Sequence, residues 1–473
     1  MADDLNTPYQ YPFPQPSEES VRFRDGAIDG RPAGVPSSYD EGGSTRWTPE
    51  AISEVHALAQ LGRYQVRGFN TFNKRMPTFD DLTFVPASMT RLPLEGYRES
   101  CDTTTILGGG RGLVEKPIEL KIPIYIASMS FGALSASAKA GLGHGASKVG
   151  TMTCTGEGGM LEEERAASKT LLYQMSPARY GVDLDHIRRA DALEIVVGQG
   201  AKPGTGGLLL GMKVSPRVSK MRTLPQGVDQ RSTIRHPDFL GADDLAVKIE
   251  ELRIATNYKV PIFLKMGATR PRYDVAIAAK AGVDVVVVDG AEGGTGASPE
   301  LLLNHTGIPT ISAIRAAREA LDEAGMTGKV SLVAAGGIRS GVDAAKCLAL
   351  GADAVMIGNA AMMALGCNSP RYLDDYRALG TSPGACHHCH TGRCPVGVAT
   401  QDPELEKRMD PHAGAERVAR YLTAMTMEIT ALAKACGKSS VHNLETEDLR
   451  AMSFEASAFT GVKMAGIDKA FSW

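Results

Sequence analysis

The sequence predicts an α/β protein built on a (β/α)8 barrel, the TIM-barrel fold. Between residues 121 and 402, eight short apolar runs alternate with stretches whose apolar residues recur at helical spacing. Most of the runs are continuously apolar, as strands buried on both faces of a parallel sheet must be. Their ends are rich in glycine, which favours a closed barrel over the alternative, an open doubly wound sheet.

The predicted elements follow one another without an internal repeat. The strands are expected at residues 122–127, 151–155, 193–197, 261–266, 283–289, 308–312, 330–335 and 354–357. The clearest helices between them are expected at residues 135–148, 242–256, 273–281, 313–324 and 341–350.

Three further segments complete the predicted domain organisation. Residues 1–45 form an extended, proline-rich arm that lacks the apolar content for a core of its own. Residues 46–120 form a pre-barrel extension, which begins with a helix from the N-cap pair Thr48-Pro49. The barrel takes residues 121–402, and residues 403–473 form a helical extension with a clear helix over 415–436.

Composition limits the class of protein. With 473 residues and 43% hydrophobic content, the chain fits one large enzyme. A net charge of −3 and a pI of about 6.4 give no indication of nucleic-acid binding. No apolar run reaches membrane-spanning length, and no signal-peptide pattern is present, so we expect a cytoplasmic location and no membrane partner. Eight cysteines then fit metal-binding thiols better than disulfides.

Three of these cysteines, Cys386, Cys389 and Cys394, lie in a glycine-rich loop over residues 384–401, after the last predicted strand. Thiolates are soft ligands, and closely spaced thiols followed by a proline, here Pro395, are typical of iron–sulfur proteins. One alternative is unligated thiols, and another is a zinc site completed by histidines. The histidines in question are His387, His388 and His390.

Glycines and polar residues follow the predicted strands. Gly336, Gly337 and Arg339 follow the seventh strand, and Gly358 and Asn359 follow the eighth, where such barrels bind phosphate. Beside an iron–sulfur centre we expect the phosphate to belong to FMN, because a flavin exchanges single electrons with a cluster and hydride with a substrate.

Four more polar residues are candidates for the chemistry. Lys265 lies on a barrel strand, where a cation would stabilise a reduced flavin; its alternative is a lysine that extends to the barrel rim. Glu157 lies between glycines and suits a general acid/base or an amine ligand; alternatively it is a turn carboxylate without a role. Gln199 and Lys202 would bind a dicarboxylate, although Lys202 also fits a solvated loop charge.

Five motifs, in this order, make the chain resemble the FMN-binding synthase domain of the glutamate synthase family over about residues 80–450. They are Met129-Ser-Phe-Gly-Ala-Leu-Ser135, Thr155-Gly-Glu-Gly-Gly159, Gln199-Gly-Ala-Lys-Pro-Gly204, Gly293-Gly-Thr-Gly-Ala-Ser-Pro299 and Cys394-Pro-Val-Gly-Val-Ala-Thr-Gln401. The resemblance implies FMN, a 3Fe–4S cluster and the reduction of 2-iminoglutarate to glutamate.

The resemblance also assigns residues. Glu157, Lys202 and Gln199 would act on the 2-oxo acid, and Cys386, Cys389 and Cys394 would bind the cluster. FMN would contact Ser128, Met129, Ser130, Thr155, Gln199, Lys265, Glu292, Gly293, Gly294, Thr295, Gly336, Gly337, Arg339, Gly358 and Asn359.

Some features depart from the family pattern. The first gap between cluster thiols is shorter than usual, which makes Cys367 a spare ligand candidate. The loop over residues 231–240 and the tail over residues 434–444 are similar to a subfamily, the C subunit of N-methylglutamate synthase (methylamine–glutamate N-methyltransferase). This similarity implies formation of N-methylglutamate from glutamate and methylamine with release of ammonia. The alternatives are glutamate synthesis from 2-oxoglutarate and ammonia, and a non-catalytic electron-transfer subunit.

The partners are expected from the same resemblance. The sequence shows no glutaminase module and no glycine-repeat β-helix. We therefore expect a hetero-oligomer with a glutaminase-like class II amidotransferase subunit and a β-helix glutamate-synthase-like subunit. The arm over residues 1–45 would lie across a neighbouring subunit through Tyr9, Tyr11 and Phe13, or else remain a free tail.

Overall fold

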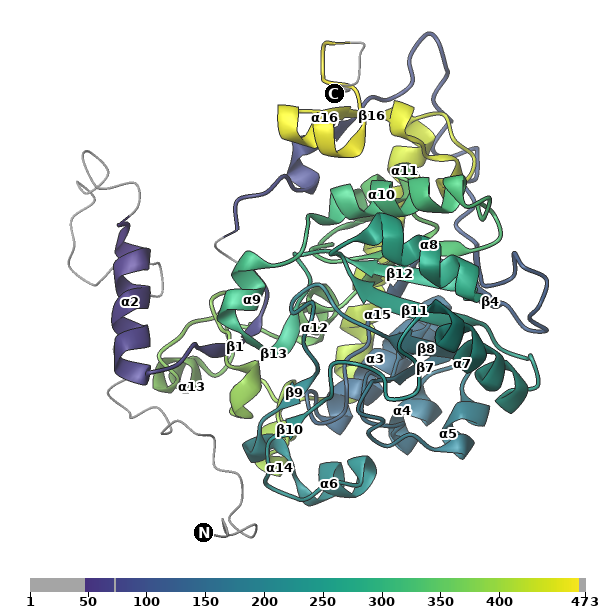
Figure 1. Ribbon diagram of the computed structural model, residues 1–473. Coiled ribbons are helices and arrows are strands. Elements are labelled where there is room, and N and C mark those ends of the chain that lie inside the picture. Colours follow the sequence, from purple (N-terminus) through teal and green to yellow (C-terminus); the bar gives the residue numbers. More distant parts are fainter. Residues whose placement is uncertain (1–46, 72–73, 468–473) are drawn as a thin grey trace.

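The computed structural model describes residues 47–71 and 74–467, so the predicted arm lies outside the described residues. At its centre is a sheet that includes β7, β8, β11 and β12 (Figure 1). The sheet has eight parallel strands in the order β5-β15-β14-β12-β11-β8-β7-β6. The strands are β5 (Ile124–Ile126), β6 (Thr153–Cys154), β7 (Leu171–Met175), β8 (Ala192–Val196), β11 (Ile262–Gly267), β12 (Val285–Asp289), β14 (Ser331–Ala335) and β15 (Ala354–Ile357).

The first two strands close this sheet into a barrel. Beside β5 and β6, the backbone N–H of Ile126 donates to the carbonyl of Met152 at 3.1 Å. The hydroxyl of Thr151 donates to the carbonyl of Ile124 at 2.5 Å. The ring is therefore complete, which confirms the predicted (β/α)8 barrel and excludes the open sheet.

One predicted strand is wrong, and one strand was missed. Residues 308–312 are not a strand, because Pro309 caps the helix α10 (Thr310–Glu323) and Ile311, Ile314 and Leu321 are buried at helical spacing. The missed strand is β7, a fully buried apolar run whose preceding crossover is only the short helix α4 (Glu162–Ala167). Consequently the strand that carries Lys265, expected to be the fourth, is the fifth, while β14 and β15 keep their places.

The barrel interior is filled by alternate side chains of its strands. Val285 and Val287 pack inside with Phe263, whereas Val286 and Val288 pack among the surrounding helices. The hairpin of β3 (Thr105–Leu107) and β4 (Ile118–Leu120) contributes Leu107, Ile118 and Leu120 to the interior cluster. Because this hairpin packs beside the residues just before β11 and β12, it covers the amino-terminal end of the barrel and leaves the carboxyl end open.

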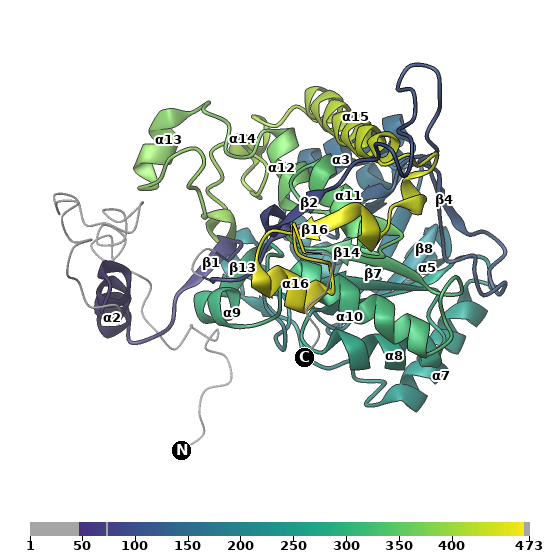
Figure 2. The same cartoon turned by 90° about the horizontal axis from the view of Figure 1, so that it is seen from above.

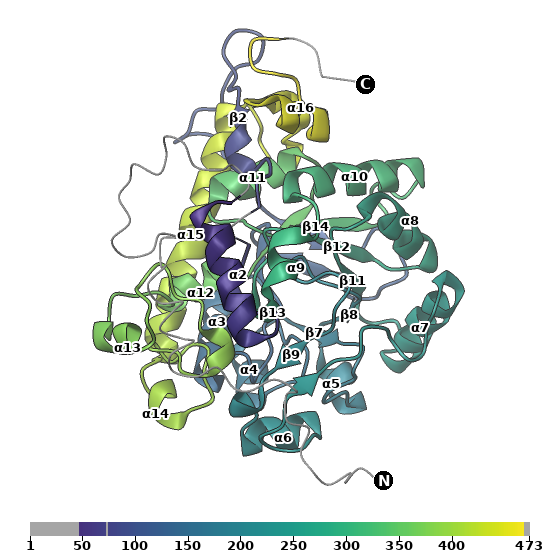
Figure 3. The same ribbon diagram turned by 60° about the vertical axis from the view of Figure 1, so that its left-hand side comes forward.

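Helices surround the sheet, and the long helix α15 runs beside α3 and α11 (Figure 3). The helices around the barrel are α3 (Ala136–Val149), α5 (Leu184–Arg189), α7 (Ala242–Ala255), α8 (Pro271–Ala281), α9 (Glu300–His305), α11 (Gly341–Ala349) and α12 (Asn359–Leu365). Later or inserted ones are η3 (Gly211–Lys213), α6 (Pro216–Arg222), α13 (Leu373–Ala378), η4 (Cys389–Thr391), α14 (Pro403–Glu406), α15 (Pro411–Ala435), η5 (Val441–Asn443), η6 (Thr446–Asp448) and α16 (Phe454–Thr460). No helix of the described chain is both long and apolar enough to span a bilayer.

The segments outside the barrel pair with distant parts of the chain. Strand β1 (Val66–Phe69) pairs with β13 (Thr295–Pro299), beside the open end of the barrel. Strand β2 (Leu82–Phe84), after η2 (Phe79–Asp81), pairs with β16 (Leu449–Ala451) of the C-terminal extension. The pair β9 (Leu208–Leu209) and β10 (Gln230–Arg231) encloses α6. The helix α2 (Pro49–Leu61), with Thr48 as its N-cap, projects from the body (Figure 2).

Candidate functional site

A cavity of about 670 Å³ opens at the carboxyl end of the barrel. It lies where the loops after the strands converge, which is where barrel enzymes place their sites. Of the predicted residues, Glu157, Lys202, Gln199, Ser128, Met129, Ser130, Lys265, Glu292, Gly293, Gly294, Thr295, Gly336, Gly337, Arg339, Gly358, Asn359 and Cys389 line it. Thr155, Cys386 and Cys394 lie outside its lining; the Thr155 hydroxyl accepts from the backbone N–H of Gln174, which does line it.

Lys265 reaches the cavity from β11 and is buried at 4% exposure. Its Nζ lies 3.5 Å from the Asp289 carboxylate and donates to the hydroxyl of Ser128 at 3.3 Å. Burial opposes protonation of Lys265, but the carboxylates of Asp289 and Glu194 outweigh it and raise the pKa above its usual value. A fixed positive charge therefore lies at the floor of the cavity.

Below this floor lies a second carboxyl group. Glu194 is fully buried in β8, and its Oε1 accepts from the side-chain amide of Gln174 at 2.6 Å. Burial raises the pKa of Glu194, while Lys265 and the Gln174 hydrogen bond oppose this shift. The hydrogen bond holds the amide of Gln174 in place at the cavity wall.

Glu157 follows β6, and its carboxylate lies against the backbone of Gly207. A Cβ atom added to Gly207 would overlap this carboxylate, so a larger residue there would force the Glu157 side chain to move. The segment that carries Gly207 leads into Leu208 and Leu209, which also line the cavity. The acid of Glu157 is thus placed beside an apolar surface.

Two buried cations complete this side of the cavity. Lys202 is 3% exposed, and its Nζ donates to the carbonyl of Ala297 at 3.0 Å. Arg222 is 2% exposed and donates to the Ser130 hydroxyl at 3.1 Å and the Phe131 carbonyl at 2.8 Å, while its Nε has no hydrogen-bond partner among the described residues. Burial lowers the pKa of both groups, and the nearby Glu157 opposes the shift. Both cations are suited to an anionic ligand.

The part of the cavity that follows β12, β14 and β15 is built on glycines. A Cβ on Gly337, whose φ is +70°, would lie 2.7 Å from the Cβ of Glu292. Glu292 is held by Thr310, whose hydroxyl donates to its Oε2 at 2.7 Å and whose N–H donates at 3.0 Å. A Cβ on Gly294 would overlap the amide of Asn359. At these glycines the backbone itself lines the cavity.

Arg339, which was predicted to contact the cofactor, forms ion pairs at the protein surface. Its side chain is 61% exposed. It pairs with Asp80 at 2.8 Å and with Asp343 at 3.2 Å. Its guanidinium therefore lies at the rim of the cavity rather than at its floor.

The cysteine loop passes the cavity at Cys389. Burial, followed by the charges of Cys389, Cys394 and Cys386, raises the pKa of Cys367 well above its usual value, so the four thiols share one neighbourhood. The side chain of Asn368 fixes the start of this loop by accepting from the N–H of Cys386 at 3.3 Å. No three His, Cys, Asp or Glu side chains of the described chain are arranged as metal ligands.

Lys213 lies behind this loop and is 2% exposed. Its Nζ donates to the carbonyls of Ala133 at 2.7 Å and Cys389 at 2.8 Å. Burial lowers the pKa of Lys213 to about 8, while the thiols of Cys389 and Cys394 oppose this shift.

A second cavity, of about 910 Å³, lies on the other side of the cysteine loop. His387, His388 and His390 line it, and the rings of His387 and His388 stack with centroids 4.5 Å apart. Leu61 and Tyr64, at the end of α2, lie at its edge. The loop is therefore a partition between two cavities.

Several lining residues were not predicted from the sequence. Gln174 was missed together with its strand, although the apolar run around it was a readable signal. Arg222 comes from α6 and Phe69 from β1, and neither segment belongs to the regular strand-and-helix pattern. Phe69 has φ +88°, a strained value for a bulky residue. Asp289 was predicted to end a strand, but its ion pair with Lys265 was not predicted.

The chain matches one family model and resembles several known proteins. The family model described as "Conserved region in glutamate synthase" matches residues 65–439. A "Glutamate synthase large subunit-like protein" of Rhizobium meliloti is 55% identical over 415 residues, covering 88% of this chain and 93% of that protein. An "Archaeal glutamate synthase [NADPH]" of Methanocaldococcus jannaschii is 35% identical over 448 residues, covering 89% and 85%. A solved structure of a mutant flavocytochrome b2 with benzoylformate is 15% identical, with a TM-score of 0.49 and 92% coverage of both chains.

Proposed function

The chain belongs to the glutamate synthase family, and from this premise we propose that its cavity binds FMN and reduces an imine of 2-oxoglutarate to the amino acid. The observation that carries the proposal is the arrangement of charges around one cavity. A paired cation, Lys265, lies at its floor, and two cations without carboxylate partners in the described chain, Lys202 and Arg222, lie at its side. An acid, Glu157, faces the same space.

The cavity suits FMN for two reasons. Backbone after β14 and β15, at Gly336, Gly337 and Gly358, faces the cavity where barrels of this kind receive a phosphate. Lys265 supplies positive charge where a reduced ring would need it. When bound, FMN would supply hydride transfer and single-electron exchange.

The substrate would lie beside Glu157 and the two cations Lys202 and Arg222. Lys202 and Arg222 would bind the carboxylates of 2-oxoglutarate through charge-assisted hydrogen bonds, which are the strong kind. Glu157 would hold the amine or move a proton at the imine nitrogen, because it lines the same cavity as the two cations. Gln199, on the same rim, would orient the oxo acid.

We propose further that Cys386, Cys389 and Cys394 bind a 3Fe–4S cluster. The donor set supports this, because the thiols of Cys386, Cys389 and Cys394 all contribute to the raised pKa of Cys367, which places the four thiols in one neighbourhood. Cys389 also lines the flavin cavity, so electrons would have a short path. Three ligands favour a cluster that lacks one iron, whereas a fourth thiolate from Cys367 would permit 4Fe–4S.

A second candidate function is formation of N-methylglutamate from glutamate and methylamine, with release of ammonia. One observation favours it: Leu208 and Leu209 give the cavity an apolar wall directly after Gly207, beside Glu157. A methyl group would gain from contact with such a surface. The net reaction would need no external reductant, since the hydride removed from glutamate returns to the N-methyl imine.

One experiment separates the two candidates. Purified protein, checked for flavin and iron, is given 2-oxoglutarate with either ammonia or methylamine under a chemical reductant, and separately glutamate with methylamine alone. Glutamate from the ammonia mixture supports the first candidate, and N-methylglutamate without reductant supports the second. No amino acid from any mixture, with flavin bound, would refute both.

The cysteine assignment has its own test. Cys389→Ser should abolish the iron signal, while Cys367→Ser, the matched control on a neighbouring thiol, should retain it. Iron lost on changing Cys367, or one zinc per chain in place of iron, would contradict the assignment.

The assembly belongs to the same proposal. We propose that a separate amidotransferase subunit delivers the amine and that a β-helix subunit completes the complex. The projecting helix α2 supports a contact surface, because Ile52, Val55 and Leu58 are 43%, 48% and 39% exposed. Changing all three to serine should weaken co-purification of the partners while flavin content stays unchanged.

A further inference from the structure

Lys213 joins two segments that are far apart in the sequence. Its ammonium donates to the carbonyl of Ala133, which lines the flavin cavity after β5. It also donates to the carbonyl of Cys389, in the middle of the cysteine loop. One side chain therefore holds the loop against the cavity wall.

The stem of Lys213 is fitted to the same loop. A Cβ on Gly392 would lie 3.2 Å from its Cγ, and the φ of Gly392 is +78°, so a larger residue at Gly392 would meet both a tight contact and backbone strain. Two further hydrogen bonds join the same segments: the Gln401 amide donates to the Leu134 carbonyl and the Ser135 hydroxyl to the Gly397 carbonyl, both at 2.8 Å. Of the side chains that form these hydrogen bonds, Lys213 is the charged one.

The charge of Lys213 has no acidic partner. Within the described chain no carboxylate pairs with its Nζ, and the ionisable groups beside it are the thiols of Cys389 and Cys394 and the like-charged guanidinium of Arg222. A buried ammonium is costly unless an anion compensates it. A cluster held by thiolates is such an anion, and its reduced form carries one more negative charge than its oxidised form.

We propose that Lys213 is a positioning residue that fixes the cysteine loop against the flavin cavity and places a positive charge beside the iron–sulfur centre, raising its reduction potential. The inference rests on the proposed cluster and goes beyond it, because it assigns the loop's geometry and the cluster's potential to one residue outside the ligand set. Reduction potentials of such clusters respond to nearby charge and hydrogen bonds.

The test compares Lys213→Met, which removes the charge and the donors, with Lys213→Arg, which keeps both. The matched control is Lys346→Met, because Lys346 is also buried and donates to a backbone carbonyl, that of Phe79 at 2.8 Å, away from the cavity. Each protein is measured for iron and flavin content and then titrated potentiometrically, with the cluster followed by its electron paramagnetic resonance signal.

The expected result is a lower midpoint in Lys213→Met, equivalent to at least a roughly tenfold change in the oxidised-to-reduced ratio at a fixed potential. Lys213→Arg should remain within about threefold of the parent, and Lys346→Met should not shift, even if it melts earlier. If Lys213→Met loses iron, restoration by Lys213→Arg supports the proposal, and loss in both variants with flavin retained overturns it.

An unchanged midpoint in Lys213→Met with its iron retained would also overturn the proposal. Failure of the proposed cluster itself is seen before any variant is compared, because the parent protein would then contain flavin but no iron.

Discussion

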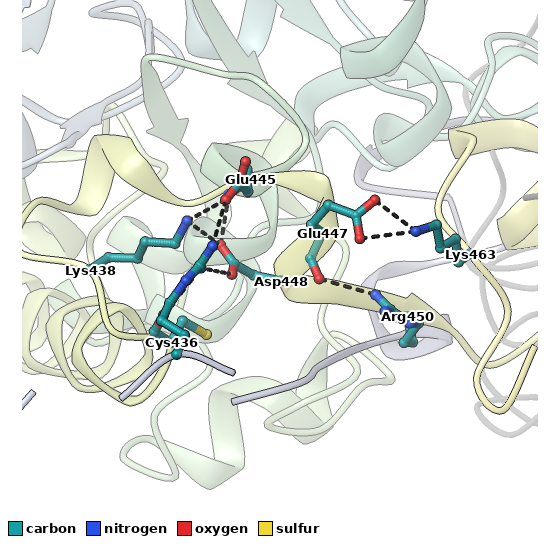
Figure 4. Close-up of polar contacts among 8 residues, drawn as sticks. Cys436, Lys438, Glu445, Glu447, Asp448, Arg450 and Lys463 are labelled. Atoms are coloured by element: carbon teal, nitrogen blue, oxygen red, sulfur yellow. Dashed lines mark hydrogen bonds and ion pairs between the residues drawn. The ribbon is translucent and has the colours of Figure 1, made fainter. Parts of the chain in front are cut away.

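Lys438 and Lys202 are both buried lysines, but their surroundings are opposite. Lys438 is 8% exposed and lies between the carboxylates of Glu445 at 2.5 Å and Asp448 at 3.4 Å (Figure 4). Arg91 adds a second cation, 3.0 Å from Asp448. Lys202 is 3% exposed, donates to a carbonyl, and within the described chain forms no ion pair.

The difference separates charges that serve the fold from charges that serve a ligand. The Lys438 network joins the segment at Arg91 to the C-terminal extension, and none of its members lines the cavity. Lys202 remains costly to bury until an anion arrives, which is expected at a binding site rather than in a structural core. The same substitution at the two lysines should therefore give opposite results.

The largest effect is expected for Lys202→Met. Binding of 2-oxoglutarate should weaken by about 10³-fold, because a buried, charge-assisted contact to a carboxylate is lost. The free energy of unfolding should stay the same or rise, because no ion pair is broken. Calorimetric titration of the flavin-loaded protein measures the first quantity and denaturant unfolding the second.

Lys438→Met should show the reverse. The variant should lose about 3 kcal/mol of unfolding free energy, since Asp448 and Glu445 lose a buried partner and only Arg91 remains. Substrate affinity should match the parent. If Lys438→Met weakens binding, or if Lys202→Met destabilises the fold to the same extent, the distinction between the two regions is wrong.

Gly207→Ala tests the acid rather than the cations. The added methyl group would overlap the carboxylate of Glu157, so Glu157 must turn away from the substrate. We expect kcat/KM to fall by about 10²-fold, in the range of a displaced general acid or base. The control is Gly96→Ala, where a Cβ meets no atom within 4 Å. Equal activity in the two variants would remove Glu157 from the proposed chemistry.

The residues of the site differ in how well their position could be predicted from the sequence. Residues that directly follow a strand, such as Glu157 and Lys202, were predicted because barrel topology brings all strand ends to one place. Arg222 and Phe69 were not, because their distance from the site depends on how α6 and β1 fold back over the barrel. That packing is a tertiary property which no local pattern encodes.

The two errors in the predicted fold also have a physical reason. The run at Leu171–Met175 was readable as a strand, but the short helix before it gave no amphipathic signal to separate two units. Residues 308–312 have the composition of a strand, so the helix predicted at residues 313–324 was placed three residues too late; it begins at Thr310, directly after Pro309. The two errors cancel in number, so the barrel was predicted correctly from an incorrect set of strands.

His236 is a buried titratable group that differs from both lysines, because it is neutral in the folded protein at neutral pH. Its ring is 3% exposed, donates a hydrogen bond to the Val196 carbonyl at 2.8 Å, and stacks on Phe239. Burial lowers the pKa of His236 from 6.5 to about 4. The charged groups that face it are Arg179, Asp238 and Lys248.

The smallest effect is therefore expected for His236→Gln, and it should appear only in acid. Between pH 6.5 and 4 the unfolded chain binds a proton at His236 that the folded chain does not, so its contribution is complete above pH 6.5 and is lost as the pH falls toward 4. From about pH 7.5 to about pH 4.5 the parent should lose about 2 kcal/mol more unfolding free energy than the variant, after allowance for partial solvent screening. Denaturant unfolding at a series of pH values measures this difference. Parallel pH profiles of parent and variant would show that His236 is protonated in the folded protein, and hence that burial there does not suppress its charge.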